Sequence, residues 1–469
     1  MAAGGTRLTR LKSGLHMNST AVNERLDTGQ RMLAVGLVLG VSLVGFEVTA
    51  LTTVLPTVTD ELGGDSLYGV CLAVYTLAGM VSLVIAGRAA DRSGPAFVMT
   101  ASLAVFIVGL VVSGVAPDMW TVVAGRTLQG LGAGGFSPVA YMLIKRAFPV
   151  SRQPVMFVWI GAGWVVPSLV APLFAGLVTD LFGWRWVFFG IVPLAALVGL
   201  LSVGPMRRYP PEPGVEHLDD QPRSGLFALL AAMGAGTFVL ALPAANPVVA
   251  VVGCAAGIAL GLWALVRLVP AGMLTARPGF PALLSVRFLS AATFIAVDGF
   301  VPLAADRIHD ASPIMQGFVI VGGAIAWTGG QALITRFPDI TPRTATRIGF
   351  VLMMAGIVGV APVLSASWSL WAVFIGWTIG GVGMGVLYNP TTVASMSYAV
   401  PGTEGRVSGQ VRLIESLGFS IGYAFGGAFV AAADRGQMTY PTAIGISFVC
   451  ALAFGAVGLL ASRGVRAAE

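Results

Sequence analysis

Two acidic residues, Glu47 and Asp298, stand inside long apolar runs of the chain and are 251 positions apart. The same separation relates further pairs: Arg92 and Arg343, and the segments 125–134 (GRTLQGLGAG) and 376–385 (GWTIGGVGMG). Glycine matches alone would carry little weight, since the chain holds 62 glycines. Because acids and arginines keep the separation too, we interpret the chain as two related halves. Parallel repeats with a site between them are typical of secondary transporters.

An ionised carboxylate is costly in hydrocarbon, so an acid inside an apolar segment points to proton transfer or ligand binding. Asp298 has no arginine at the position that matches Arg126, because Trp377 stands there. We therefore predict that Asp298 is unpaired and that it carries a proton or holds a cationic substrate. The alternative is a protonated aspartate that hydrogen-bonds to the backbone.

Glu47, in contrast, has a candidate partner in Arg126. Glu47 lies eight residues before the outer end of one predicted span, or ~12 Å deep, and Arg126 lies seven residues into another, or ~10 Å deep. These depths predict a buried pair, direct or through Gln129, that serves proton coupling. The alternative is an ion pair that only locks two helices together. Either role predicts intolerance of mutation.

Other polar groups also lie within predicted spans. Glu415 follows Arg412 by three residues, which favours a local ion pair near the inner end of a helix. Asn389 precedes Pro390, which frees a backbone carbonyl, so Asn389 and Gln129 are candidate substrate contacts, with a plain packing kink as the alternative at Pro390. Several aromatic residues could line an apolar pocket or serve only for packing: Phe46, Trp159, Trp164, Phe294, Trp327 and Tyr388.

The composition indicates that membrane lipid surrounds most of the chain. Mean hydropathy is +0.86, and 10% of residues are charged, against about 25% in soluble domains. We predict an all-α polytopic membrane protein. The net charge of +6 is spread over short loops, which argues against a nucleic-acid partner. Cys71, Cys254 and Cys450 stand in apolar runs, and the three histidines form no ligand pattern, so we expect neither a disulfide framework nor a metal or cofactor.

Apolar windows between charged or Pro/Gly breaks give 14 candidate spans of ~20 residues, with 12 as the fallback count. They predict two six-helix bundles with two extra helices between them: tail 1–31, N-terminal bundle 32–205, linker 206–223, inserted helices 224–268, C-terminal bundle 281–462 and tail 463–469. Lysine and arginine concentrate in alternate loops, and the opposite loops hold only Arg185, Arg307 and Arg435. The positive-inside rule therefore places the linker and both termini in the cytoplasm.

The segment from Gly87 to Gly94 reads GRAADRSG, with Asp91 and Arg92 between two glycines that we expect to form a tight turn. This GxxxDRxG pattern resembles the loop signature of the major facilitator superfamily. Other segments are similar to motifs of its 14-span drug:proton antiporter branch: residues 46–49, the fourth-span set Arg126, Gln129, Gly130 and Gly132, and residues 184–188. The resemblance covers essentially the whole chain.

The resemblance implies a proton-coupled exporter of amphipathic or cationic small molecules in the cell membrane, which we expect to act as a monomer. In that family the loop aspartate, here Asp91, holds the outward-facing state, and Arg92 belongs to the same relay. The first-span acid and the fourth-span arginine, here Glu47 and Arg126, serve proton coupling.

This chain departs from the family at three places. The first-span acid is usually an aspartate, and Thr52 and Thr53 stand where an asparagine is common. In the fifth-span antiporter motif Pro172 and Gly176 remain as helix-packing residues, while alanines replace two glycines. These departures give weight to a different cargo, such as an endogenous lipid, siderophore or metabolite. A third interpretation, a membrane enzyme or receptor, lacks a recognisable nucleophile–base set or metal cluster in the sequence.

Overall fold

The computed structural model describes residues 26–149, 151–211, 224–400 and 404–468, without the side chains of residues 91, 154, 157, 158, 161, 165, 168, 224, 404 and 405. Throughout these ranges the regular secondary structure is helical. Most of the predicted tail 1–31 and most of the predicted linker 206–223 lie outside the described residues, as does the side chain of Asp91.

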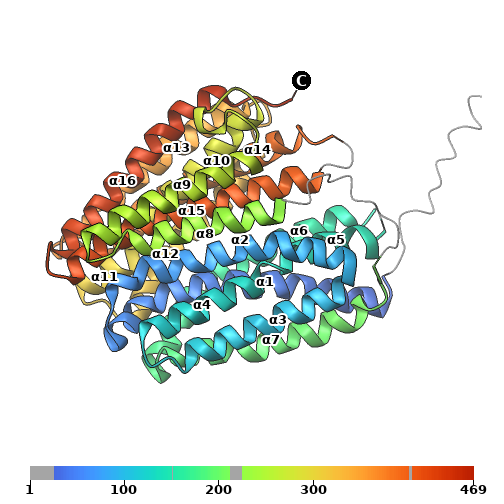
Figure 1. The fold of residues 1–469 in the computed structure, drawn as a ribbon, viewed down its shortest axis with the longest axis horizontal. Helices are drawn as coiled ribbons and strands as arrows, with labels where there is room; N and C mark the ends of the chain where they lie inside the picture. Colours follow the sequence, from blue (N-terminus) through green and yellow to red (C-terminus); the bar gives the residue numbers. More distant parts are fainter. Residues whose placement is uncertain (1–25, 150, 212–223, 401–403, 469) are drawn as a thin grey trace, which may run out of the picture.

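The N-terminal half forms one bundle (Figure 1). Its helices are α1 (Thr28–Leu62), α2 (Tyr68–Ser93), α3 (Pro95–Gly114), α4 (Met119–Ala133), α5 (Phe136–Ala147), α6 (Gln153–Phe182) and α7 (Arg185–Met206), with a 3-10 turn η2 (Asp65–Leu67). Helix α1 starts with a capping box, in which Asp27 and Gln30 each accept a hydrogen bond from the other's backbone N–H. Helix α1 then packs against α6 and α7, and its Leu33 and Leu37 are buried.

The C-terminal half forms a second bundle with the same pattern of neighbours. Its helices are α10 (Phe280–Asp298), α11 (Val301–His309), α12 (Pro313–Ile334), α13 (Pro342–Val360), α14 (Leu370–Met396), α15 (Glu404–Asp434) and α16 (Tyr440–Ala461), with 3-10 turns η3 (Met273–Thr275), η4 (Ala361–Leu364) and η5 (Ser462–Gly464). Helix α10 packs on α15 and α16 as α1 packs on α6 and α7, and α14 packs on α12 and α13 as α4 packs on α2 and α3. This equivalence agrees with two related halves.

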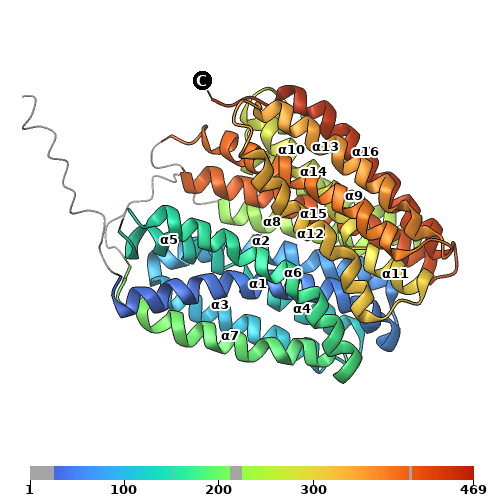
Figure 2. The ribbon, with the colours of Figure 1, turned by 180° about the vertical axis from the view of Figure 1, so that it is seen from behind.

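Two helices, α8 (Ser224–Ala241) and α9 (Pro247–Leu268), form a hairpin between the halves in the sequence. They approach closely at glycines, since a Cβ on Gly257 would lie 2.6 Å from the backbone nitrogen of Phe238. Helix α8 runs beside α2 and α15, where the two bundles meet (Figures 1 and 2). Helix α9 lies on the outer side of α8. Much of the apolar surface of α9 is exposed, as expected for a helix that faces lipid.

Twelve helices of the described chain are long and apolar enough to cross a membrane. The 14 predicted spans all coincide with helices, but two of them fall short of this requirement. Helix α8 offers a shorter apolar stretch, Gly225–Ala241, and the predicted span 119–147 is divided into α4 and α5 at Gly134 and Gly135. Both glycines keep right-handed helical dihedral angles, so α5 continues the course of α4. The structure supports 12 spans, and the count of 14 stays a prediction.

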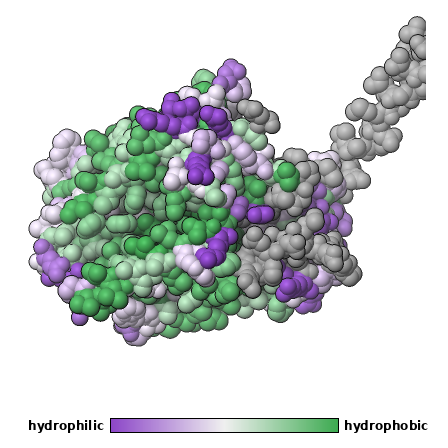
Figure 3. All heavy atoms as spheres, turned by 45° about the horizontal axis from the view of Figure 1, so that its top comes forward, coloured by the Kyte–Doolittle hydropathy of each residue, from purple (hydrophilic) through white to green (hydrophobic). Residues whose placement is uncertain are grey.

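Successive helices run in alternate directions between two ends of the molecule when α4–α5 and α10–α11 are each taken as one (Figure 1). We call the end where α1 begins and α16 ends the terminal end, and the end where α1 stops and α2 begins the distal end. Arg92 closes α2 at the terminal end, whereas Arg185 and Arg307 lie at the distal end. Between the two ends, apolar side chains cover most of the face seen in Figure 3, so the surface agrees with a multi-pass membrane protein.

The predicted tight turn from Gly87 to Gly94 was wrong. Helix α2 continues through Gly87, Asp91 and Arg92 and ends at Ser93. Gly94 is the single residue between the two helices, since α3 begins at Pro95. Its φ of 84° favours glycine. Arg92 is exposed in the last turn of α2, so the motif forms a helix end rather than a loop.

The two bundles touch backbone to backbone at the distal end. A Cβ on Gly427 of α15 would lie 2.6 Å from the Cα of Gly69 in α2, which is closer than two carbons can approach. A Cβ on Gly176 of α6 would likewise lie 2.6 Å from the carbonyl oxygen of Pro313 at the start of α12. In addition, the Tyr68 hydroxyl donates a 2.9 Å hydrogen bond to the Gly299 carbonyl. Glycine is therefore required where the halves close.

We predict that Gly427→Val separates the bundles at the distal end. Overpacking costs about 1–3 kcal/mol, so the separated population should rise about tenfold. Spin labels at positions 62 and 310, both at the distal end, would report this as a longer distance in pulsed electron resonance. Gly329→Val is the matched control, because a Cβ on Gly329 meets open space. Unchanged distances in Gly427→Val would contradict the prediction.

Candidate functional site

Glu47 and Arg126 form a buried ion pair between α1 and α4. Each residue is 1% exposed. Arg126 Nη1 also donates a 2.6 Å hydrogen bond to Gln129 Oε1, and Gln129 Nε2 donates one of 3.1 Å to the Ser113 hydroxyl. The structure thus contains the direct pair that the depths of these residues suggested, and Gln129 contacts Arg126 rather than bridging it to Glu47. Gln129 is fully buried, so in this conformation it can orient Arg126 but cannot touch a solvent-borne ligand.

The surroundings of this pair exclude water. The guanidinium of Arg126 lies over the ring of Tyr75, 4.1 Å from its centroid. Gly130 and Gly132 let α4 approach its neighbours, since a Cβ on Gly130 would lie 2.9 Å from Ala78 Cβ in α2, and one on Gly132 would lie 2.6 Å from Phe106 Cβ in α3. These glycines fix the depth at which Arg126 meets Glu47.

Asp298 has a partner, so the prediction that it is unpaired was wrong. Trp377 Nε1 donates a 2.8 Å hydrogen bond to Asp298 Oδ1. Asp298 is the last residue of α10, and the helix breaks at Gly299 and Phe300 before α11 begins. Trp377 is fully buried, whereas Asp298 is half-buried. An indole N–H can support the carboxylate but cannot neutralise its charge, which leaves Asp298 free to bind a proton.

The two acids occupy equivalent places. Glu47 of α1 pairs with Arg126 of α4, and Asp298 of α10 pairs with Trp377 of α14, which are the first and fourth major helices of the respective halves. Tyr423 of α15 touches both halves, since a Cβ on Gly299 would lie 2.5 Å from Tyr423 Cε1 and one on Gly69 of α2 would lie 2.5 Å from the Tyr423 carbonyl oxygen. Tyr423 therefore lies at a junction between the bundles, beside the helix break that follows Asp298. Tyr423 was not identified from the sequence, since a tyrosine in an apolar run gives no signal.

Aromatic side chains continue from Asp298 toward the terminal end. Trp377 stacks on Phe294 at 4.8 Å between ring centroids, Phe294 contacts Trp327 at 5.2 Å, and Trp327 contacts Tyr388 at 5.4 Å. Phe294, Trp327 and Tyr388, which the sequence suggested as pocket-lining residues, therefore form one cluster in the C-terminal half. Phe46, Trp159 and Trp164 belong to the other half, where both tryptophans are exposed on α6.

A second buried charge cluster ends this aromatic column. Arg412 Nη1 lies 2.9 Å from Glu415 Oε2, which is the local pair expected from the sequence. Arg287 of α10 approaches the same carboxylate, with Nε 3.8 Å from Glu415 Oε1, and its guanidinium lies 3.6 Å from the centroid of the Tyr388 ring. Arg287 is 3% exposed and was overlooked in the sequence, although an arginine inside an apolar run is itself a signal.

Asn389 is half-buried in α14, and no described group hydrogen-bonds its side chain. The helix continues through Pro390 to Met396, so Pro390 does not end it. Asn389 stays a candidate substrate contact. Pro172 packs against α12, where a Cβ on Gly317 would lie 2.7 Å from the Pro172 carbonyl carbon, so Pro172 and Gly176 lie where the halves touch.

Charged residues also join the halves at the distal end. Arg307 of α11 pairs with Asp65 at 2.9 Å and also with Asp60 and Asp306. The Tyr440 hydroxyl donates a hydrogen bond to Asp65. Asp60 lies in the last turn of α1 and Asp65 begins η2, whereas Arg307 and Tyr440 belong to the C-terminal half. These contacts hold the distal end closed in this conformation.

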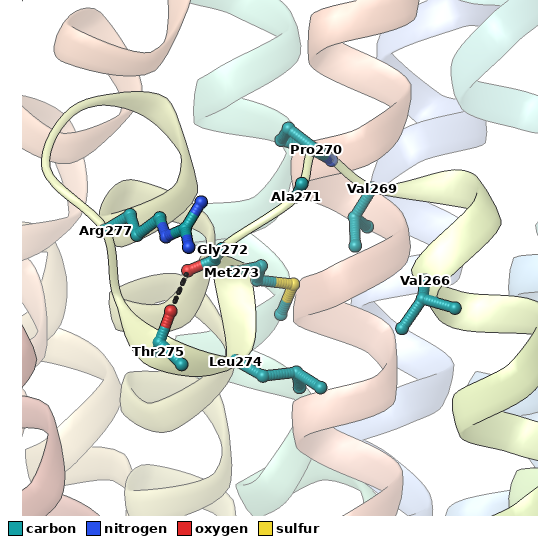
Figure 4. A pocket seen from close by; sticks show the side chains of 9 residues that line it. All are labelled: Val266, Val269, Pro270, Ala271, Gly272, Met273, Leu274, Thr275 and Arg277. Atoms are coloured by element: carbon teal, nitrogen blue, oxygen red, sulfur yellow. Dashed lines mark hydrogen bonds between the residues drawn. The ribbon is translucent and has the colours of Figure 1, made fainter.

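Two apolar hollows lie away from these charges. One, of about 260 Å³, lies where α9 ends and leads into η3, and its only polar side chains are Thr275 and Arg277 (Figure 4). The other, of about 300 Å³, is lined by Phe46, Phe174 and neighbours on α6 and α7. Neither is lined by an acid, so we do not assign the proton-coupling chemistry to them. In the described part of the chain, no group of His, Cys, Asp and Glu is arranged to hold a metal ion.

Comparison with known proteins places these features in a family. Residues 37–423 match the Major Facilitator Superfamily. An uncharacterized MFS-type transporter of Mycobacterium tuberculosis is 28% identical over 427 residues, and the match covers 87% of this chain but 60% of that protein. A probable multidrug-efflux transporter of the same organism is 27% identical over 462 residues, and the match covers 91% of this chain and 94% of that protein. Multidrug resistance protein 3 of Bacillus subtilis is 24% identical over 408 residues, with 84% and 78% covered.

Solved structures show the same fold at low sequence identity. A bacterial homolog of the human lysosomal transporter Spinster has a TM-score of 0.67 and 16% identity, with 94% of this chain and 98% of that chain covered. The POT family transporter PepTSo has a TM-score of 0.63 and 15% identity, with 92% and 96% covered. With a family match over most of its length, this chain belongs to the Major Facilitator Superfamily of multi-pass membrane transporters.

Proposed function

We propose that this protein exports amphipathic or cationic small molecules across the cell membrane in exchange for protons, by alternating access. The terminal end faces the cytoplasm in this proposal, and α8 and the α4–α5 pair complete 14 spans. The concentration of arginine at the terminal end supports this orientation. The relatives named for multidrug efflux support the export function.

The observation that carries the proposal is the equivalent placement of two acids. Glu47 and Asp298 each contact the fourth major helix of their own half, and Tyr423 lies at the junction between the bundles beside the helix break that follows Asp298. A proton that binds at such a junction can change the contacts between the halves, and that change is what coupling requires. We assign proton coupling to Glu47, Arg126 and Asp298. Gly87, Asp91, Arg92 and Gly94 are proposed to control the closing of the terminal end.

The membrane potential is sufficient to drive such an exchange. A proton that enters down a 100 mV potential releases ~2.3 kcal/mol before any pH gradient is counted. A tenfold concentration ratio of a neutral substrate requires ~1.4 kcal/mol. One or two protons per molecule therefore sustain ordinary export. A monomer is sufficient for this mechanism, because both acids belong to one chain.

Reconstitution in liposomes with an imposed pH gradient tests the proposal. Lumenal pH would be followed while cationic dyes and amphipathic drugs are added. We expect proton movement that depends on the added compound and is lost in Glu47→Gln. Glu61→Gln is a matched control, because Glu61 belongs to the same helix but pairs with Arg185 at the distal end. Absence of compound-dependent proton movement from folded protein would refute drug:proton exchange and shift the proposal to an endogenous lipid, siderophore or metabolite.

A further inference from the structure

The geometry points to a second ligand-binding site in the C-terminal half, where Arg412, beside the buried Arg287, receives an acidic group, such as a carboxylate, of the transported molecule. This inference rests on the proposed export function and names a substrate class for it. The class is amphipathic molecules that carry an acidic group, alone or beside a cationic one. The site lies in α10 and α15, about 16 Å from Asp298 along α10.

The first argument is charge. Glu415 is the one carboxylate that pairs with both Arg287 and Arg412, and no other acid among the described side chains pairs with either arginine. Arg287 and Glu415 each have side chains that are 3% exposed, and all three residues lie within membrane-spanning helices. The cluster therefore has one positive charge in excess inside a span. Such a charge is costly without a counter-ion, and an acidic ligand would supply it.

The second argument is the supply of hydrogen-bond donors. Arg287 is fixed, since Nη2 donates a 2.8 Å hydrogen bond to the Thr392 hydroxyl and Nη1 donates to the Thr391 hydroxyl at 3.3 Å. Its Nε is buried and has no hydrogen-bond partner. Arg412 is 35% exposed and uses one donor, Nη1, on Glu415. Its remaining N–H groups can hold a carboxylate in the two-point geometry that arginine favours.

The third argument is what lies beside the arginines. The Tyr388 ring lies under Arg287 and contacts Trp327, whose Nε1 is buried without a hydrogen-bond partner. An apolar body could pack on these rings while its acidic group reaches Arg412.

Binding of two matched dyes tests this site. Rhodamine 110 has a free carboxylate, and rhodamine 123 is its methyl ester, so the two share one aromatic body. We would measure their dissociation constants by fluorescence anisotropy with the full-length protein in lipid nanodiscs, without a pH gradient. We expect rhodamine 110 to bind about tenfold more tightly, as a charge-assisted hydrogen bond contributes about 1.5–3 kcal/mol. Equal affinities, including no binding of either dye, would overturn the proposal.

Variants at Arg412 test the assignment with little risk to folding, because the Arg287–Glu415 ion pair remains. We expect Arg412→Gln to weaken rhodamine 110 binding about tenfold and to leave rhodamine 123 unchanged, while Arg412→Lys keeps part of the preference. Arg463→Gln, at an exposed position near the chain end, should change neither affinity. An equal loss for both dyes in Arg412→Gln would contradict a site for the carboxylate.

The binding assay tests the second site, and the proton assay tests proton exchange, so the two proposals can be refuted independently. Proton movement with cationic dyes combined with equal binding of the two rhodamines would overturn the second site alone. A preference for the carboxylate without any proton movement would refute proton exchange and leave the second site in place.

Discussion

Replacement of Glu47 by glutamine is expected to abolish proton-coupled transport. Glutamine keeps the shape of the side chain but replaces one acceptor oxygen by an NH2 donor and cannot release a proton. The buried Arg126 is then left without its counter-ion, so the variant should also lose about 3–5 kcal/mol of stability. Lumenal pH in proteoliposomes measures the transport, and thermal unfolding in detergent measures the stability.

A double variant separates the functional from the structural role of this pair. Glu47→Gln combined with Arg126→Gln removes both charges, and replacement of a whole buried pair often restores stability. We expect the unfolding temperature to recover while proton-coupled transport stays at the level of protein-free liposomes. If the double variant transported with normal coupling, the pair would serve only to hold α1 against α4.

Replacement of Asp298 by asparagine is expected to cut coupled transport by about tenfold or more and to remove its pH dependence between pH 6 and 8. Asparagine keeps the oxygen that accepts the hydrogen bond from Trp377, so the local structure should persist. The initial rate of dye-dependent proton movement at a series of pH values provides the measurement. An unchanged pH profile would show that Asp298 carries no proton during transport.

Two further variants serve as controls for Asp298. Asp310→Asn removes an exposed carboxylate just beyond α11 and should leave the profile unchanged. Trp377→Phe keeps the aromatic contact with Phe294 and the carboxylate of Asp298 but removes the N–H donor. We expect this variant to retain coupled transport with a displaced pH profile. Loss of coupling in Trp377→Phe equal to that in Asp298→Asn would assign the essential function to the hydrogen bond instead.

The sequence predicted the helices and the Glu47–Arg126 contact because both follow from distance along the chain. An apolar run has a defined length in a membrane, and residues at equal depth on neighbouring helices can meet. The interruption of span 119–147 at Gly134 and Gly135 was not visible, since helix continuity there depends on how the glycines pack. The partner of Asp298 was missed for a different reason. Trp377 stands where an arginine would have signalled a partner, but its indole N–H also donates a hydrogen bond to the acid.

The Arg287 cluster shows where comparison of the two halves fails. Position 36, which corresponds to Arg287 under the 251-residue separation, is a glycine, so the repeat gives no signal there. Glu415 was assigned to a local pair because its nearest charge in the sequence is Arg412. Arg287 approaches the same carboxylate from another helix, and that contact depends on how α10 packs against α15. Such tertiary contacts are not encoded in the spacing of residues along one helix.

The acids around Arg307 determine the electrostatic potential at the distal end. Three carboxylates, from Asp60, Asp65 and Asp306, share one guanidinium, so this end carries a negative potential. Cations, protons among them, are concentrated near such a surface, and salt screens the effect beyond about 8 Å at physiological ionic strength. In the proposed exchange this is the end at which protons are taken up, so the attraction would gather them there, and the ionic strength of the medium on that side sets how far it extends.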